Sequence, residues 1–374
     1  MNRKRGVYET MKKNRLTRTL ALMLSLVLAA ASLSGCGGSE SSDAGDTINI
    51  AIMRSGFTLP LYYASENGLF EEAGLNVEVQ YYDNGPQVNE AIASGAVDIA
   101  GIGQMPSVTG GIANKSKVVA WMEDDEASVQ AYARNDSDIV AEGKGHVEGH
   151  PDIYGTAETW KGKKIICAKG TSSHFGLLAT LSALGLSDSD VTIVDMEGSK
   201  GATTFASGEG DIFFGFDPQW SEFYSNTDDY TLISTCKSAG QSLYTVLIAS
   251  DAFCNERSED LTALLKVMLE VEETFRNDPD KYAEEMYNWQ AFYGNSTEEL
   301  AAYSAELKPY RTLDEQKAMF SSDNGSSEVD ASYEKVIDFM IANHVISEED
   351  AEAFYDNETI NPAFMLDAID RIQG

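Results

Sequence analysis

The segment KKIICAKGTSSHFGLLATLSALG, residues 163–185, combines a strand, a tight turn and the start of a helix. Residues 164–168 are apolar and partly β-branched, which predicts a buried strand. Gly170 ends that strand. The residues that follow recur at helical spacing and predict a helix: Leu177, Leu178, Leu181 and Leu184.

Thr171, Ser172 and Ser173 bring hydroxyl groups to the start of that helix. A helix N-terminus has unpaired N–H donors and carries about half a positive charge, so it favours a carboxylate, sulfonate or phosphate. The alternative interpretation is a capped helix that binds no ligand, because Ser and Thr are ordinary caps. His174 comes next and has the same two interpretations, a ligand contact or a hydrogen-bonded residue of the first helical turn.

Residues 1–35 have the pattern of a secretory signal. A basic region precedes an apolar run over residues 20–31, which is too short to span a bilayer. The run ends in Leu-Ser-Gly-Cys, which resembles the lipobox of bacterial lipoproteins, with Cys36 as the lipid-bearing residue. The alternative is an ordinary signal with a chance cysteine. We expect an extracytoplasmic protein, held at the bacterial membrane by the lipid on Cys36 and by a flexible tether over residues 36–46.

The formal net charge is −33, and it becomes −39 without residues 1–35, which hold seven Lys and Arg and one Glu. Such an acidic chain argues against nucleic acid and anionic lipid as partners. It does not argue against a small anionic ligand, because donors in a cleft act locally and the global field is screened.

The remaining cysteines are Cys167, Cys236 and Cys254, and their spacing is not that of a metal site. We interpret them as buried apolar residues, with a bridge between Cys236 and Cys254 left open. His146 and His150 have no accompanying ligand cluster in the sequence. We therefore predict no metal and no cofactor.

Residues 47–102 alternate predicted strands and helices in the order β-α-β-α-β, which favours a parallel sheet with helices on both faces. Ligands of such sheets bind beyond the carboxyl ends of the strands. Three loops lie there: residues 54–58, residues 103–107, and the region after the strand over residues 117–121.

A repeat indicates two similar lobes. Residues 93–99 read ASGAVDI and residues 206–212 read ASGEGDI, with five of seven positions identical and a strand, turn and helix before each copy. The second copy continues into an aromatic loop that holds Asp217 and Trp220. Trp220 is a candidate for stacking on a ligand, and packing into the core is the alternative.

The predicted lobes are residues 47–127 with 249–374 for lobe I and residues 128–248 for lobe II. Residues 128–134 and 243–249 alternate like strands where the chain changes lobe, so we expect them to cross as a hinge. Residues 135–159 are polar and rich in glycine, which predicts an exposed insertion. Residues from 258 onward are mainly helical, and we expect a structural cap on lobe I.

These features in order resemble one family: the lipobox, LPLYYASENGLFEEAGLNVEV at residues 59–79, the two repeat copies and GKKIICAKGTSSH at residues 162–174. The family is that of the nitrate, sulfonate and taurine substrate-binding proteins of ABC importers, which also includes binders of thiamine-precursor pyrimidines. The resemblance covers about residues 47–275. It implies a two-lobed type II periplasmic-binding fold, built from mostly parallel sheets, with a ligand between the lobes.

The resemblance also implies contact regions at the first loop, the loop after the first repeat copy, the hydroxyl turn and the loop after the second copy. With Trp121 added as an aromatic candidate, the predicted ligand-binding residues are Ser55, Gly56, Phe57, Gln104, Met105, Trp121, Thr171, Ser172, Ser173, His174, Asp217 and Trp220. The hydroxyl turn fits an anionic group. Asp217 and Glu197 favour an amine if they face the cleft, so a zwitterion such as taurine or an amino-heterocycle satisfies both.

We therefore expect a monomeric solute-binding protein that delivers a small polar ligand to an ABC permease with its ATPase. One alternative is a ligand-sensing module for a separate signalling partner. The other is an enzyme like the pyrimidine synthases of similar fold, which the sequence disfavours because it lacks their cysteine-rich run and shows no catalytic constellation.

Overall fold

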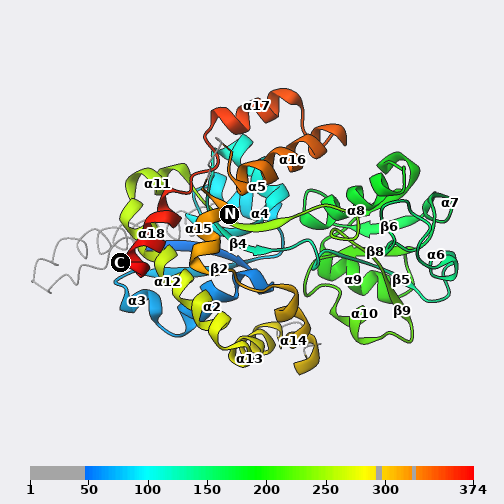
Figure 1. Ribbon diagram of the computed structural model, residues 1–374, viewed down its shortest axis with the longest axis horizontal. Helices are drawn as coiled ribbons and strands as arrows, with labels where there is room; N and C mark the ends of the chain where they lie inside the picture. Colours follow the sequence, from blue (N-terminus) through cyan, green and yellow to red (C-terminus); the bar gives the residue numbers. More distant parts are fainter. Residues whose placement is uncertain (1–46, 292–296, 322–325) are drawn as a thin grey trace, which may run out of the picture. The chain divides into compact units, whose positions relative to one another are not determined.

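The computed structural model describes residues 47–291, 297–321 and 326–374. Its strands form two five-stranded sheets, and helices cover both of them (Figure 1). We refer to each sheet with its helices as a lobe. The predicted α/β class is confirmed. The predicted signal segment and Cys36 lie outside the described residues.

The sheet of lobe I has the strand order β2-β1-β3-β10-β4. Strand β10 runs antiparallel to β3 and β4, and the other pairs are parallel. Its strands are β1 Ile48–Met53, β2 Val77–Tyr82, β3 Ile99–Gly103, β4 Lys117–Asp124 and β10 Tyr244–Ala249. Strands β1, β3 and β10 are almost entirely buried, because helices cover both faces of the sheet.

The sheet of lobe II repeats this arrangement with the order β7-β6-β8-β5-β9. Strand β5 is the antiparallel one here, paired with β8 and β9. The strands are β5 Gln130–Arg134, β6 Lys164–Cys167, β7 Thr192–Asp195, β8 Ile212–Gly215 and β9 Tyr230–Thr235. The matching orders show that the two lobes share one topology.

The chain passes between the sheets in the loops before β5 and before β10. Residues 125–129 form the first passage and residues 236–243 the second. Strands β5 and β10 themselves pair inside the two sheets. This corrects the expectation that these two strands cross between the lobes. Their alternating pattern reflects burial within a sheet.

The repeated aspartates hold equivalent places in the two lobes. Asp98 accepts a hydrogen bond from the backbone N–H of Asn49 at 2.8 Å, and Asp211 accepts one from Lys164 at 2.8 Å. The backbone N–H of each aspartate donates back to the carbonyl of the same partner. The repeat therefore joins β3 to β1 in lobe I and β8 to β6 in lobe II.

The helices before residue 250 alternate with the strands and cover the sheets (Figure 1). Those of lobe I are α2 Leu59–Glu66, α3 Leu69–Glu72, α4 Gly85–Ala93 and α5 Gln104–Asn114, after a 3-10 turn, η1 Gly56–Thr58. Those of lobe II are α6 Asp138–Glu142, α7 Ala157–Trp160, α8 Ser172–Ala183, α9 Gly198–Ala206 and α10 Ser221–Ser225, with a 3-10 turn at η2 Asp188–Asp190.

Helices also fill the C-terminal region, as predicted. They are α11 Asp251–Glu256, α12 Ser258–Asn277, α13 Pro279–Gln290, α14 Glu298–Leu307, α15 Leu313–Met319, α16 Glu328–Ala342, α17 Glu348–Asp356 and α18 Ala363–Gln373. Helix α12 packs on α2 and α18 in lobe I.

Helices α14 and α16 also reach lobe II, so the C-terminal region is more than a cap on lobe I. Leu300 of α14 lies in the apolar cluster formed by the core of lobe II. Tyr303 stacks on Tyr224 with ring centroids 4.2 Å apart. On α16, the ring of Phe339 lies 4.8 Å from that of Phe175 in α8. The C-terminal helices therefore bridge the two lobes.

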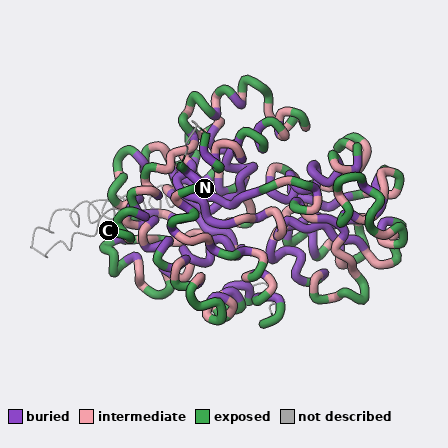
Figure 2. The backbone as a smooth tube through the Cα atoms, in the orientation of Figure 1, coloured by how far each residue is buried: buried purple, intermediate pink, exposed green. Residues whose placement is uncertain are grey.

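Buried residues follow the strands of both sheets and the inner faces of the helices (Figure 2). Cys167, Cys236 and Cys254 are buried free thiols, so the bridge left open between Cys236 and Cys254 is not formed. Within the predicted insertion at residues 135–159, Ile139 and Ile153 anchor the segment in the core. In the described part of the chain, no helix combines the length and the apolar character needed to cross a membrane.

Candidate ligand-binding site

A small cavity lies where the two lobes meet, beyond the carboxyl ends of strands from both sheets. Its volume is about 10 Å³, room for roughly one water molecule. Its lining residues are Met53, Phe57, Gly85, Gly103, Pro106, Asp125, Thr171, Ser172, Phe216 and Thr245. This is the place where open α/β sheets hold their ligands.

The lobes touch most closely between β3 and α8. A Cβ atom added at Gly103, the last residue of β3, would lie 2.3 Å from the hydroxyl oxygen of Ser172. One added at Gly170 would lie 3.4 Å from Pro86 in lobe I. The small cavity thus reflects closely packed lobes, and Gly103 permits that approach because it has no side chain.

The predicted hydroxyl turn forms one wall of the cavity. Thr171 is the N-cap residue of α8, but its hydroxyl donates to the carbonyl of Ala168 at 2.7 Å and accepts no bond from the helix. Ser172 lines the cavity, and the buried hydroxyl of Ser173 has no hydrogen-bond partner among the described residues. The N-terminal donors of α8 therefore lie uncapped beside the cavity, as an oxygen-rich ligand group requires.

A buried ionic cluster lies behind the opposite wall. Its four members are Glu123, Asp125, Asp217 and Lys308, which we call the Lys308 cluster. The ammonium nitrogen of Lys308 lies 2.9 Å from Glu123 Oε1, 3.6 Å from Asp217 Oδ2 and 4.0 Å from Asp125 Oδ1. All four side chains are at most 4 % exposed. The cluster joins the end of β4, the first passage between lobes, the loop after β8 and the end of α14.

Burial and mutual attraction shift the ionisation of this cluster. Burial raises the pKa of Glu123 to about 8, although Lys308 opposes the shift. Burial also raises the pKa of Asp125. For Lys308, burial alone would lower the pKa, but the attraction of Glu123, Asp217 and Asp125 is stronger and raises it. Lys308 is therefore charged and Glu123 largely protonated at neutral pH.

Asp217, one of the predicted site residues, contacts the C-terminal helices. Its Oδ1 atom accepts hydrogen bonds from Ser304 at 2.8 Å and from Gln290 at 3.3 Å. Its Oδ2 atom faces Lys308 and has no hydrogen-bond partner among the described residues. The loop after the second repeat copy is thus held by α13 and by the region of α14.

The first predicted loop also reaches the cavity. Phe57 lines it, and the ammonium of Lys308 lies 5.8 Å from the centre of the Phe57 ring. A Cβ atom added at Gly56 would lie 3.4 Å from Asp217 Oδ2. The hydroxyl of Ser55 is buried and has no hydrogen-bond partner in the part of the chain that the structure describes, while its carbonyl accepts a bond from Trp289 at 2.9 Å.

Gln104, Met105 and Trp121 are not among the cavity-lining residues. The Gln104 amide donates to Ser332 at 2.9 Å and accepts from the backbone of Tyr244 at 3.2 Å. Met105 lies in the apolar core. The ring of Trp121 lies 5.1 Å from the guanidinium carbon of Arg311. In this closed arrangement all three therefore serve packing within lobe I and its helices.

Trp220 and His174 also lie away from the lining. Trp220 is fully buried in the apolar cluster of lobe II and donates its indole N–H to the carbonyl of Ser128 at 2.8 Å. His174 accepts a bond from the backbone N–H of Gly170 at 3.4 Å, and burial lowers its pKa. Glu197 caps α9 by accepting bonds from Ser199 and Lys200.

The model of the NMT1/THI5-like family matches residues 57–282, more than half of the chain. The chain belongs to this family. The match begins at Phe57, beside the cavity, and ends within α13.

Two relatives of this chain have names that describe binding proteins. A putative ABC transporter periplasmic binding protein of Brachyspira hyodysenteriae is 28 % identical over 82 % of this chain and 89 % of the relative. A putative aliphatic sulfonates-binding protein of Bacillus subtilis is 28 % identical over 53 % of this chain and 57 % of the relative. Both names are those of binding proteins.

Solved structures show that this NMT1/THI5-like chain has the predicted two-lobed fold. The alkanesulfonate-binding protein SsuA from Xanthomonas axonopodis pv. citri, bound to MOPS, aligns with a TM-score of 0.66 at 18 % identity, over 85 % of this chain and 99 % of that chain. The periplasmic aliphatic sulphonate binding protein SsuA from Escherichia coli aligns with a TM-score of 0.62 at 17 % identity, over 81 % of this chain and 89 % of that chain.

The residues predicted from the sequence to bind the ligand do not include Glu123, Asp125 and Lys308, which lie at or beside the cavity. A signal for the first two was present, because residues 123–126 are four consecutive acidic residues directly after a buried strand. An acidic run beside a predicted ligand loop indicates that some of these carboxylates are buried near the site and do not all face solvent. Lys308 carried no comparable signal, since it follows an ordinary amphipathic helix far along the chain.

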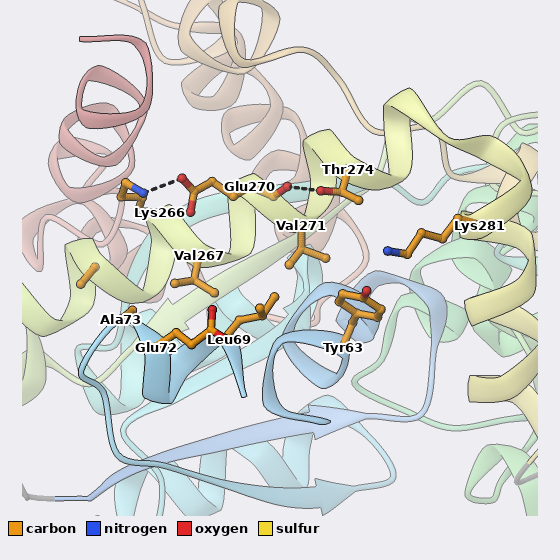
Figure 3. Close-up of a pocket in the computed structure, with 11 residues that line it drawn as sticks. Tyr63, Leu69, Glu72, Ala73, Lys266, Val267, Glu270, Val271, Thr274 and Lys281 are labelled. Atoms are coloured by element: carbon orange, nitrogen blue, oxygen red, sulfur yellow. Dashed lines mark hydrogen bonds and ion pairs between the residues drawn. The ribbon is translucent and has the colours of Figure 1, made fainter. Parts of the chain in front are cut away.

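A larger hollow of about 640 Å³ lies within lobe I of this NMT1/THI5-like chain, between α12 and the helices α2 and α3. Val267 and Val271 of α12 point toward Leu69 and Tyr63, and Lys266 pairs with Glu270 at the rim (Figure 3). No lobe II residue lines this hollow. A molecule bound there would contact lobe I alone and would not link the lobes.

Proposed function

We propose that this chain captures a small polar solute between its lobes and delivers it to the permease of an ABC importer. One observation carries the proposal: Thr171 and Ser172 of lobe II and Phe57 and Asp125 beside lobe I line a single cavity. A ligand that contacts both sides binds the closed arrangement best and shifts the population toward it. A permease can then recognise the closed form as loaded.

The ligand is a sulfonate, taurine-like or nitrate-like anion, or an amino-heterocycle. The uncapped N-terminus of α8, with Ser172 and the unpartnered hydroxyl of Ser173, suits an oxygen-rich group. The name of the Bacillus relative refers to aliphatic sulfonates, and the Xanthomonas protein was solved with MOPS, itself a sulfonate. The lobes must separate to admit such a ligand, because the closed cavity has room for roughly one water.

The protein works outside the cytoplasm, anchored by a lipid on Cys36. The lipobox-like residues 33–36 support this placement, as does the periplasmic binding protein of Brachyspira among the relatives. Cys36→Ser should move the protein from the membrane fraction to the soluble fraction of a cell lysate. Cys254→Ser is the control, because it removes a buried thiol within the folded lobe.

Two alternative functions are sensing for a separate signalling partner and pyrimidine-synthase-like catalysis. The binding-protein relatives disfavour catalysis. Sensing uses the same cleft but requires no transport. Uptake of a radiolabelled ligand by cells with and without this protein separates import from sensing, because a sensor leaves the uptake rate unchanged.

The binding site itself is tested by a thermal-shift screen followed by calorimetry. The panel contains sulfonates, nitrate, amino-pyrimidines and aromatic acids. Ser172→Ala with Ser173→Ala should weaken binding of the best ligand by about 1 to 3 kcal/mol, since buried polar groups then lose partners. Ser182→Ala, at an exposed position of the same helix, is the matched control. If the double variant and the control bound the ligand as tightly as the wild type, the turn at the start of α8 would not contact the ligand.

A further inference from the structure

The last turn of helix α13 holds one loop from each lobe. The indole N–H of Trp289 donates to the carbonyl of Ser55 at 2.9 Å, in the loop after β1 of lobe I. The side-chain amide of the next residue, Gln290, donates to Asp217 Oδ1 at 3.3 Å, in the loop after β8 of lobe II. Two consecutive residues of one helix therefore bind loops that belong to different sheets.

Each of these loops contributes an aromatic side chain to the wall of the inter-lobe cavity. Phe57, two residues after Ser55, lines the cavity from the first loop. Phe216, directly before Asp217, lines it from the second loop. Trp289 and Gln290 are not among the lining residues. Any effect of α13 on the cavity therefore passes through the two loops that it holds.

The contact of α13 with the first loop is buried and closely packed. Trp289 is 1 % exposed, so water does not compete for its hydrogen bond to the loop. Its ring lies 4.2 Å from that of Tyr62 in α2, measured between centroids. A Cβ atom added at Gly56 would lie 2.9 Å from the methyl carbon of Met286, one turn earlier in α13. The loop that carries Phe57 is thus fixed against the helix by packing as well as by the hydrogen bond.

The contact with the second loop is a closed network of three buried side chains. Ser304 of α14 donates to Asp217 Oδ1 at 2.8 Å, the same oxygen that Gln290 reaches. Gln290 also donates to the Ser304 hydroxyl at 2.8 Å, because its amide carries two N–H groups. The loop that carries Phe216 is therefore held from both helices at once.

The helix pair α13 and α14 spans the two lobes. The two helices pack on each other (Figure 1). Helix α13 also packs on α2 and α12 of lobe I, whereas α14 packs on α10 of lobe II. The pair is therefore placed to set the position of one loop relative to the other.

We propose that Trp289 and Gln290 are positioning residues for ligand binding, which fix Phe57 and Phe216 at the two sides of the cavity. The inference rests on the proposed function and adds the part of the chain that sets the shape of its site. Loops that are ordered before a ligand arrives lose less conformational freedom on binding, and this increases affinity. The helix pair thus contributes to affinity although no described residue of either helix lines the cavity.

Trp289→Phe tests the contact with the first loop. It keeps an aromatic ring beside Tyr62 and removes the N–H that the Ser55 carbonyl accepts. Trp160→Phe is the matched control, because the buried Trp160 also donates its indole N–H to a backbone carbonyl, that of Tyr154 at 2.8 Å. In calorimetry with the whole mature protein, Trp289→Phe should weaken binding of the best ligand of the panel by about tenfold and the control by less than about threefold.

Gln290→Met tests the contact with the second loop and should weaken binding by about as much. Gln316→Met is the matched control, since the amide of the buried Gln316 also donates to a buried carboxylate, that of Glu272 at 3.0 Å. Ser304→Ala removes the other donor to Asp217 Oδ1 and is the milder second variant if Gln290→Met folds poorly. The order of affinities across the panel should stay the same in all three loop variants, because none of them changes a residue that lines the cavity.

Hydrogen exchange of the ligand-free protein separates positioning from general stability. Followed by mass spectrometry, Trp289→Phe should speed exchange in residues 54–61, and Gln290→Met in residues 213–220, by about threefold or more relative to the rest of the chain. A purely structural role would instead speed exchange throughout the protein, as the two control variants should if they lower its stability.

The outcomes separate this inference from the proposed function. Loops that exchange as in the wild type, or affinities that fall equally in the variants and their controls, overturn the positioning role and leave the proposed function intact. Faster exchange in the loops with unchanged affinity also overturns it. If no compound of the panel binds the wild-type protein, the proposed function fails and this inference fails with it.

Discussion

The ammonium nitrogen of Lys308 lies 3.6 Å from Asp217 Oδ2, and neither side chain is exposed to solvent. Lys308 follows α14 in the C-terminal region, whereas Asp217 follows β8 in lobe II. The ion pair therefore joins the end of α14, a helix that packs on lobe II, to the loop after the second repeat copy. Through Glu123, the same ammonium also reaches the end of β4 in lobe I.

Lys308→Met should lower the free energy of unfolding by about 3 to 5 kcal/mol, because it leaves buried carboxylates without their cation. Urea denaturation followed by circular dichroism measures the change. Lys317→Met is the matched control, since Lys317 pairs with Asp370 at the surface with 41 % of its side chain exposed. The control should lose less than about 1 kcal/mol. Similar losses in both variants would show that the buried cluster contributes little.

Stability should decrease as pH rises toward 8, because Glu123 keeps its proton in the folded protein. Its pKa is raised from 4.5 to about 8, mainly by burial. Between these values the unfolded chain has released the proton and the folded chain still holds it, so rising pH favours unfolding. The contribution is at most about 1.4 kcal/mol per pH unit.

Glu123→Gln isolates this contribution, because glutamine has nearly the same shape and does not titrate in this range. Thermal denaturation from pH 5 to pH 8 should show a smaller decline for the variant than for the wild type. Other buried acids with raised pKa, Asp125 and Glu272, remain in the variant, so its stability should still decline with pH, but less steeply. Parallel curves would mean that Glu123 is already ionised in the folded state.

The repeated aspartates should contribute similarly to the two lobes. Asp98→Ala and Asp211→Ala each remove a carboxylate that accepts a backbone N–H bond of 2.8 Å. Each should lower the free energy of unfolding by about 1 to 3 kcal/mol. Glu209→Ala, at an exposed position of the second repeat copy, should have almost no effect. Differential scanning calorimetry distinguishes this pattern from one in which only one copy is structural.

The duplicated architecture could be predicted from sequence because its signals are local. The repeat places glycine after a helix and aspartate before a buried strand in both lobes, and Gly95 and Gly208 have positive φ values of 72° and 99°. The strand-turn-helix unit around Gly170 was recognisable for the same reason. Backbone requirements of this kind are met by residues close in sequence, so most strands lie near their predicted places, whereas the short helices α6 and α7, which begin within residues 135–159, were not predicted.

Side-chain direction and long-range charge pairing could not be predicted in this way. Trp220 follows a strand end near the cleft, yet its ring packs into lobe II, because the core there accepts a large ring and its indole N–H finds the carbonyl of Ser128. Lys308 pairs with Glu123, which lies 185 positions earlier in the sequence, and no local sequence pattern predicts that contact. The acidic run at residues 123–126 could be recognised in the sequence, but Lys308 could not be identified as its partner.

Gly103→Ala should hold the lobes apart. The added Cβ would lie 2.3 Å from the hydroxyl oxygen of Ser172, and the backbone at Gly103, with φ of −72°, accepts alanine without strain. The clash is therefore between the lobes and not within lobe I. Small-angle scattering of the ligand-free protein should show a larger radius of gyration, and affinity for the best ligand should fall at least about tenfold, or 1.4 kcal/mol.

The double variant Gly103→Ala with Ser172→Gly tests whether that clash is the cause. Removing the Ser172 side chain gives the new Cβ room, so the radius of gyration should return toward the wild-type value. Affinity should recover only in part, because the Ser172 hydroxyl is lost from the cavity wall. Ser172→Gly alone serves as the reference for that loss. If the single and double variants had the same radius as the wild type, the contact between β3 and α8 would not limit closure, and the lobes would close without the approach seen at Gly103.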